Sequence, residues 1–99
     1  MEELRANSDL THLVGSEARL WHYTASHDQL TIEVSLSLTK RLYLVCVSCA
    51  KISVPRFWSL EKPEIVNAGE RWLIFRDKEV EVKCEHLVIQ EASEVGSLA

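Results

Sequence analysis

Glycine and proline are scarce in this chain, which has three Gly and two Pro among its 99 residues. Such a composition excludes a flexible linker or a low-complexity tract, and it predicts a single folded domain over residues 1–99. Apolar runs are short as well, and the longest covers residues 42–47. Because a membrane-spanning helix needs about 20 apolar residues, we expect no membrane partner.

Cysteine is rare and odd in number, at Cys46, Cys49 and Cys84. The residues after Met1 are charged and polar, without the apolar segment of a secretory signal. Both features favour free thiols over a disulfide-linked secreted fold. The sequence therefore predicts a cytoplasmic location.

The chain has no excess of basic residues: 11 Lys and Arg stand against 15 Asp and Glu, for a net charge of −4. The two signs are interspersed along the sequence. Nucleic-acid-binding proteins usually carry a clustered basic face, and anionic membrane surfaces attract the same kind of patch. We therefore expect neither nucleic acid nor a membrane surface as a partner.

Recognisable catalytic motifs are missing too, including a phosphate-binding loop and a nucleophile elbow. His27 beside Asp28 is the nearest approach to an acid–base pair. Adjacent side chains on a strand diverge, so Asp28 is better read as a turn residue and His27 as a backbone-bonded or solvated side chain. The sequence predicts no catalytic residues and no enzyme.

Alternating residues are the strongest feature that the chain does contain. Polar residues separate a series of apolar ones between residues 29 and 39, namely Leu30, Ile32, Val34, Leu36 and Leu38. This period of two predicts a strand with one buried face. The apolar run at 42–47 predicts a second strand covered on both faces, which continues past a bulge at Lys51.

Further strands are predicted at residues 19–24, 63–66, 71–76 and 79–90, and residues 55–62 are expected to form a loop. Residues 1–15 are expected to contain a short helix, because Leu10, Leu13 and Val14 share one helical face and Gly15 can end it. The predicted fold is mainly β within the α+β class. It is an antiparallel meander over 19–91 that forms a sandwich or partly open barrel, with a frayed tail at 92–99.

Four soft or borderline metal ligands occur in two short segments: Cys46 and Cys49 in a Cys-x-x-Cys, and Cys84 and His86 in a Cys-x-His. This set would suit a tetrahedral structural zinc, and a zinc-stabilised module is the alternative hypothesis. Positions i and i+3 of a straight strand point to opposite faces, however. The favoured interpretation is therefore three core cysteines and no cofactor. A redox-active pair would need a following helix, which the sequence does not predict.

Large aromatic residues occur in the expected loop at Phe57 and Trp58. Exposed aromatic side chains commonly anchor protein partners, although in a small domain the same rings can close one end of the core. We expect Phe57 and Trp58 to act as apolar anchors of a binding surface. His27 and Asp28 would add polar contacts if they lie nearby.

Four short motifs occur along this chain. They are Ser26-His27-Asp28-Gln29-Leu30, Leu42 to Cys46, Ile52 to Trp58 and the alternating stretch from Val80 to Ile89. Their arrangement resembles a loose group of small β-rich bacterial domains, with Ser26 in the place of a more common Phe and the Trp three residues after Pro55. Some members of that group are similar to immunity proteins, which neutralise toxins by direct binding. The resemblance implies a non-enzymatic module whose partner is another protein.

A small open sheet also leaves edge strands with unpaired N–H and C=O groups. Two copies of the chain could cover these edges by pairing across a two-fold axis. We therefore expect a homodimer as one form of the protein.

Overall fold

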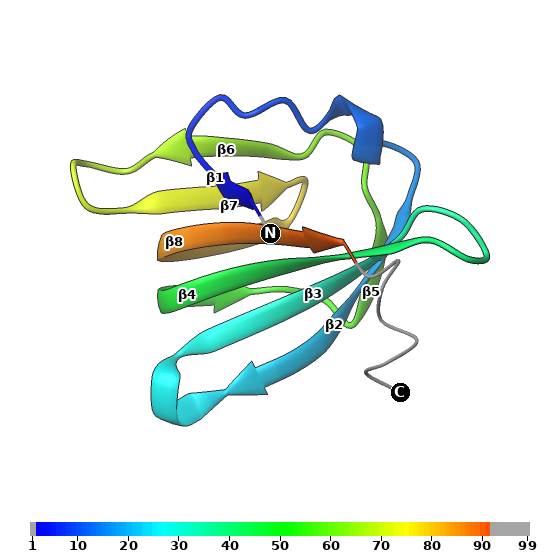
Figure 1. Cartoon of the computed structure of the whole chain (residues 1–99). Helices are drawn as coiled ribbons and strands as arrows, with labels where there is room; N and C mark the ends of the chain where they lie inside the picture. The colour runs from blue at the N-terminus through cyan, green and yellow to red at the C-terminus, as the bar shows by residue number, and fades with distance from the viewer. Residues whose placement is uncertain (1, 92–99) are drawn as a thin grey trace.

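The chain forms a single antiparallel sheet of eight strands that curls into an open half-barrel (Figure 1). The computed structural model describes residues 2–91 except for the side chain of His27, and the tail expected at 92–99 lies outside them. The strands are β1 (Glu2–Leu4), β2 (Glu17–Thr24), β3 (Gln29–Ser35), β4 (Arg41–Ser53), β5 (Phe57–Ser59), β6 (Glu64–Asn67), β7 (Leu73–Asp77) and β8 (Val80–Glu91). The mainly-β prediction is confirmed.

The strand order is β5-β2-β3-β4-β8-β7-β6, and β1 pairs with β8 outside this path. Strand β8 lies against β4 along most of its length. Its other edge pairs with β7 near its start and with β1 near its end. Residues 55–62, expected as a loop, contain the short edge strand β5 beside β2.

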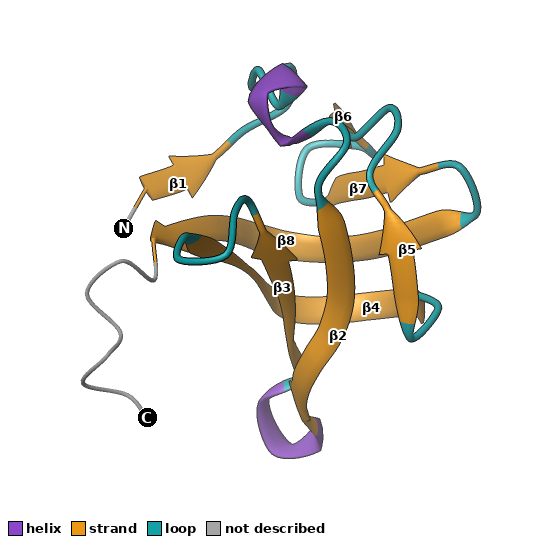
Figure 2. Ribbon diagram, turned by 90° about the vertical axis from the view of Figure 1, so that its right-hand side faces the viewer, coloured by secondary structure: helices purple, strands orange, loops and turns teal. Residues whose placement is uncertain are grey.

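The sheet must curl because its two outer strands are consecutive in sequence. Seven strands of a flat sheet would hold their outer members about 29 Å apart. Only residues 60–63 join β5 to β6, and such a connection reaches about 18 Å when fully extended. The connection therefore draws the two edges of the sheet toward one another, as the view in Figure 2 shows.

The core lies on the inner, concave face of the sheet. The period-two pattern of β3 decides which side chains enter it, since Leu30, Ile32 and Val34 are all buried. The other buried apolar residues are Leu4, Leu10, Leu13, Ala18, Leu42, Leu44, Cys46, Leu60, Ile65, Phe75, Val80, Val82, Cys84 and Leu87. No helix among residues 2–91 is long and apolar enough to cross a membrane.

The prediction of a helix within residues 1–15 is wrong. Residues 2–4 form strand β1, and the only helical turn of this segment is the 3₁₀ turn η1 (Thr11–Leu13). Backbone bonds to the sheet replace those of a helix: the Asn7 amide donates to Ile65 O at 3.0 Å, and the Gly15 amide donates to Leu60 O at 2.8 Å. Gly15 has φ +90°, which favours glycine. The segment thus crosses one end of the half-barrel and inserts the buried side chain of Leu13 into the core.

Strand β4 is bent in its second half. The pairing of β4 with β8 shifts register between Cys49 and Lys51, which confirms the bulge expected there. Just before the shift, Ser48 adopts a left-handed conformation with φ +57°. The expectation of a straight strand through Cys46 and Cys49 is therefore wrong, because one left-handed residue changes which face the following side chains point to.

Candidate functional site

An irregularity in β2 brings a tryptophan to the outer face of the sheet. The register between β2 and β3 shifts between Leu20 and His22, which leaves Trp21 as the extra residue of a bulge. Bulges commonly redirect one side chain. The Trp21 ring lies 5.8 Å from the Tyr43 ring of β4, measured between centroids. Half of the Trp21 side chain, 50%, stays exposed.

Beneath these rings lies a buried acidic side chain, Glu33 of β3, which is only 2% exposed. Its Oε1 accepts a hydrogen bond from Arg19 Nε at 2.7 Å, and its Oε2 accepts one from the Tyr43 hydroxyl at 3.1 Å. The Arg19 guanidinium also lies 4.8 Å from the centroid of the Trp21 ring. A buried carboxylate needs such partners, and here it fixes the positions of two surface side chains, Arg19 and Tyr43.

Phe57 extends the same face onto the edge strand β5. Residues Phe57 and Arg19 are direct cross-strand partners, so their side chains project from the same side of the sheet. Phe57 is 66% exposed. We call the continuous set Arg19, Trp21, Tyr43 and Phe57 the aromatic surface. It combines exposed aromatic rings with an arginine, the residue types that contribute most to binding energy at protein interfaces.

Burial is the first cause that raises the pKa of the Tyr43 hydroxyl, followed by its hydrogen bond to Glu33 and the charge of that carboxylate. We expect Glu33→Gln to lower the pKa of Tyr43, because the amide removes the negative charge. Tyr23→Phe leaves Tyr43 as the only tyrosine, so phenolate absorbance during an alkaline titration reports this group alone. An unchanged midpoint would contradict the Glu33–Tyr43 contact, and Glu85→Gln is the control that should leave the midpoint in place.

The same raised pKa makes stability depend on alkaline pH. The folded state holds the Tyr43 proton more tightly than the unfolded chain, whose group titrates near its ordinary value of 10.0. The contribution of Tyr43 to the free energy of unfolding is thus fully present below the unfolded-state pKa, and it is lost as the pH rises through the folded-state pKa.

The residues predicted from the sequence to form one binding surface lie in different parts of the structure. Trp58 points inward, packs against the core and donates a hydrogen bond from Nε1 to Asp77 Oδ2 at 3.1 Å. Asp28 follows the 3₁₀ turn η2 (Ala25–His27) at the far end of β2. From Arg19 to the end of β2 is about 17 Å of strand, which separates the η2 turn from Phe57. Only Phe57 of the predicted set belongs to the aromatic surface.

Asp28 serves the turn between β2 and β3. It is left-handed, with φ +47°, and its Oδ1 accepts a hydrogen bond from the Tyr23 hydroxyl at 3.2 Å. Its backbone carbonyl accepts a hydrogen bond from the Cys49 amide at 2.8 Å. These contacts agree with the interpretation of Asp28 as a turn residue. Of His27, the structure describes the backbone in η2 and not the side chain.

The proposed zinc ligands divide between two environments. Cys46 and Cys84 are buried, Cys49 is half-buried, and His86 is exposed. Among the described residues, no group of three or more His, Cys, Asp or Glu side chains is placed to hold a metal ion. The geometry therefore does not supply the four convergent ligands that a structural zinc requires.

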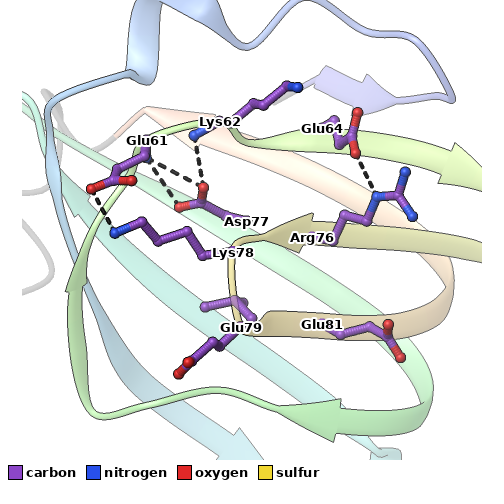
Figure 3. Close-up of a pocket in the computed structure, with 9 residues that line it drawn as sticks. Glu61, Lys62, Glu64, Arg76, Asp77, Lys78, Glu79 and Glu81 are labelled. Carbon is purple, nitrogen blue, oxygen red and sulfur yellow. Dashed lines mark hydrogen bonds and ion pairs between the residues drawn. The ribbon is translucent and has the colours of Figure 1, made fainter.

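A charged recess lies beside the turn between β7 and β8 (Figure 3). Four of its ionic side chains form two pairs: Lys78 Nζ lies 2.6 Å from Glu61 Oε1, and Arg76 pairs with Glu64. At its base, Asp77 is 1% exposed and accepts hydrogen bonds from the backbone amides of Glu61 and Lys62. Since the two ion pairs and the Asp77 carboxylate already have partners within the protein, they are better explained as contacts that stabilise the fold than as a ligand site.

Sequence reasoning missed Arg19, Trp21 and Tyr43 as surface residues. Trp21 was part of a predicted strand, but the bulge that redirects it has no glycine to reveal it. Glu33 was counted with the wet face of its strand, because a period-two pattern cannot show that neighbouring side chains cover a polar position. The only signal available was the density of aromatic residues within 19–24.

Comparison of the chain with protein-family models, with curated proteins and with solved structures finds no match. The chemistry of the surface itself must therefore support any statement of function.

Proposed function

We propose that this chain is a non-enzymatic protein-binding module that binds a partner protein through its aromatic surface. The observation that carries the proposal is the buried Glu33, which fixes Arg19 and Tyr43 around the exposed Trp21 ring. The cytoplasm is the proposed location, as the free thiols favour.

Rigid anchors favour tight binding because little conformational freedom is lost when a partner docks. Trp21 and Tyr43 project from paired strands, which are more rigid than loops. Their rings contact one another, and the Arg19 guanidinium lies over Trp21. The surface is thus preorganised in the unbound protein.

The chemistry of this surface specifies the kind of partner that fits it. Trp21 and Phe57 call for an apolar side chain on the partner. Arg19 uses Nε for Glu33, and its Nη groups, which make no hydrogen bond among the described residues, suit a carboxylate on the partner. We therefore propose a protein segment with an apolar residue next to an acidic one. By the resemblance to immunity proteins, a toxin is a specific example of such a partner.

A photo-crosslinking experiment tests the proposal. A photoreactive phenylalanine analogue at position 57 should capture the partner in extract from the source cells, and mass spectrometry should identify it. We expect Trp21→Ala to reduce its binding to the purified chain by at least tenfold, as loss of an interface hot spot does. Leu38, which is 99% exposed in the β3–β4 turn away from the aromatic surface, gives the matched control: Leu38→Ala should bind normally.

Two results would reject the proposal. One is binding that Trp21→Ala and Phe57→Ala leave unchanged, and the other is equal loss with Leu38→Ala, which would indicate a general effect. Light scattering of the purified chain distinguishes a second copy from a different protein. A homodimer that Trp21→Ala dissociates would show that this surface pairs with itself.

A further inference from the structure

The three cysteines form a cluster at the bent part of β4 and the facing part of β8. Cys49 and Cys84 are direct cross-strand partners. Cys49 Sγ donates a hydrogen bond to Cys46 O at 3.3 Å. The contact with Cys49, followed by that with Cys84, raises the pKa of the Cys46 thiol. All three are free, and the protein-binding surface uses none of them.

The backbone places Cys49 and Cys84 at a separation that suits a disulfide. The Cys49 amide donates to Asp28 O at 2.8 Å, so it points toward β3 and away from β8. Cys49 and Cys84 are therefore a non-hydrogen-bonded pair, the type with the closer Cα atoms, about 4.5 Å apart. Disulfides usually join Cα atoms separated by about 4.4–6.8 Å. Both side chains also lie on the core side of the sheet.

The three thiols differ in accessibility. Cys46 and Cys84 are buried, whereas Cys49 is half-buried and can be reached from solvent. The hydrogen bond with Cys46 is the largest cause that lowers the pKa of Cys49, and the same contact is the largest cause that raises the pKa of Cys46. Cys49 therefore ionises more readily than Cys46. A thiolate that solvent can reach is the form that reacts with oxidants.

We propose that this cluster is a peroxide-reactive site in which Cys49 is oxidised and Cys84 closes a reversible cross-strand disulfide with it. The Cys49 sulfur attacks one oxygen of a hydroperoxide and the O–O bond breaks. This gives a sulfenic acid on Cys49, and the leaving oxygen takes up a proton to form water or an alcohol. The Cys84 sulfur then attacks Cys49, the S–S bond forms, the S–O bond breaks, and the departing hydroxide takes the Cys84 proton to form water.

Mass spectrometry of the full chain after treatment with hydrogen peroxide tests this inference. We expect a mass loss of about 2 Da, which dithiothreitol reverses. Tandem spectra of the digested protein should place the bond between Cys49 and Cys84. Cys46→Ala should still form it, and Cys49→Ala should not. In Cys84→Ala we expect the reaction to stop at a sulfenic acid on Cys49 that dimedone traps.

Other products would overturn the proposal. A bond between Cys46 and Cys49, a disulfide between two chains, or unreacted thiols would each do so. Direct conversion of Cys49 to a sulfinic acid would count against it as well. If Cys84→Ala does not fold, the mapped bond in the unmodified chain and in Cys46→Ala decides the question. None of these readouts depends on the aromatic surface, so the result is independent of the proposed binding function.

Discussion

Asp77→Ala should lower the free energy of unfolding by about 4 kcal/mol, because it removes a buried carboxylate and leaves three part-buried hydrogen-bond donors without their acceptor. Asp77 lies at the end of β7, and its carboxylate accepts hydrogen bonds from Trp58 Nε1 at 3.1 Å, from the Glu61 amide at 3.2 Å and from the Lys62 amide at 2.7 Å. A loss of this size is a large part of the total stability of a small domain.

The reason for so large an effect is the position of Asp77 in the half-barrel. Its partners belong to β5 and to the connection that joins β5 to β6, the two outer strands of the sheet. One carboxylate thus holds β5 and the connection after it against β7, which itself pairs with β6; the bonds from Glu61 and Lys62 are drawn in Figure 3.

Urea denaturation followed by tryptophan fluorescence measures this effect, provided that the slope of the transition stays the same. Asp77→Asn keeps one carbonyl oxygen, so it should cost about half as much as the alanine variant. Glu79→Ala, at an exposed position two residues away, is the control and should change stability by about 0.5 kcal/mol or less. A loss below about 1 kcal/mol for Asp77→Ala would show that the carboxylate does not hold these segments against β7.

Leu13→Ala should lower the free energy of unfolding by about 3 kcal/mol, as expected for a fully buried leucine whose removal leaves a cavity. Leu13 is the last residue of η1, and it is the side chain through which the N-terminal segment closes one end of the half-barrel. The chain offers a matched control in Leu38, which loses the same atoms from a fully exposed position. Leu38→Ala should leave stability within about 0.5 kcal/mol.

The same denaturation experiment compares the two leucine variants. Equal midpoints for Leu13→Ala and Leu38→Ala would mean that the N-terminal segment detaches from the core in solution. In that case the hydrogen bonds from Asn7 to Ile65 and from Gly15 to Leu60 would also be absent. Amide hydrogen exchange at Gly15 would then be fast, whereas a docked segment should protect this amide.

Period-two alternation predicted strand β3 but not its end. It marked Leu30, Ile32, Val34, Leu36 and Leu38 as residues of one buried face. The first three are buried, but β3 ends at Ser35 and Leu38 in the following turn is 99% exposed. The bulge at Lys51 was also predictable, because the apolar pattern changes there. These features depend on the local rule that successive side chains of a strand face opposite sides of the sheet.

The prediction of a helix within residues 1–15 was wrong because the conformation of this segment depends on distant partners and not on a local rule. Leu10 and Leu13 do become buried, as helical spacing suggested, but they do so around a single 3₁₀ turn. A short helix has little stability of its own, so pairing of β1 with β8 and of Asn7 with Ile65 decides the conformation. Those partners lie more than 55 residues away along the chain, beyond any local pattern.

The sequence by itself determined the class of this protein: one antiparallel β domain, acidic, with a core built from alternating apolar residues. Tertiary structure alone decided which side chains form a surface. The bulge at Trp21, the burial of Glu33 and the left-handed Ser48 beside Cys49 all depend on how neighbouring strands pair in the assembled sheet. The sequence pattern predicts which face of a strand a residue prefers. Which side chains contact one another depends on strand register and sheet curvature, and only the assembled sheet defines these.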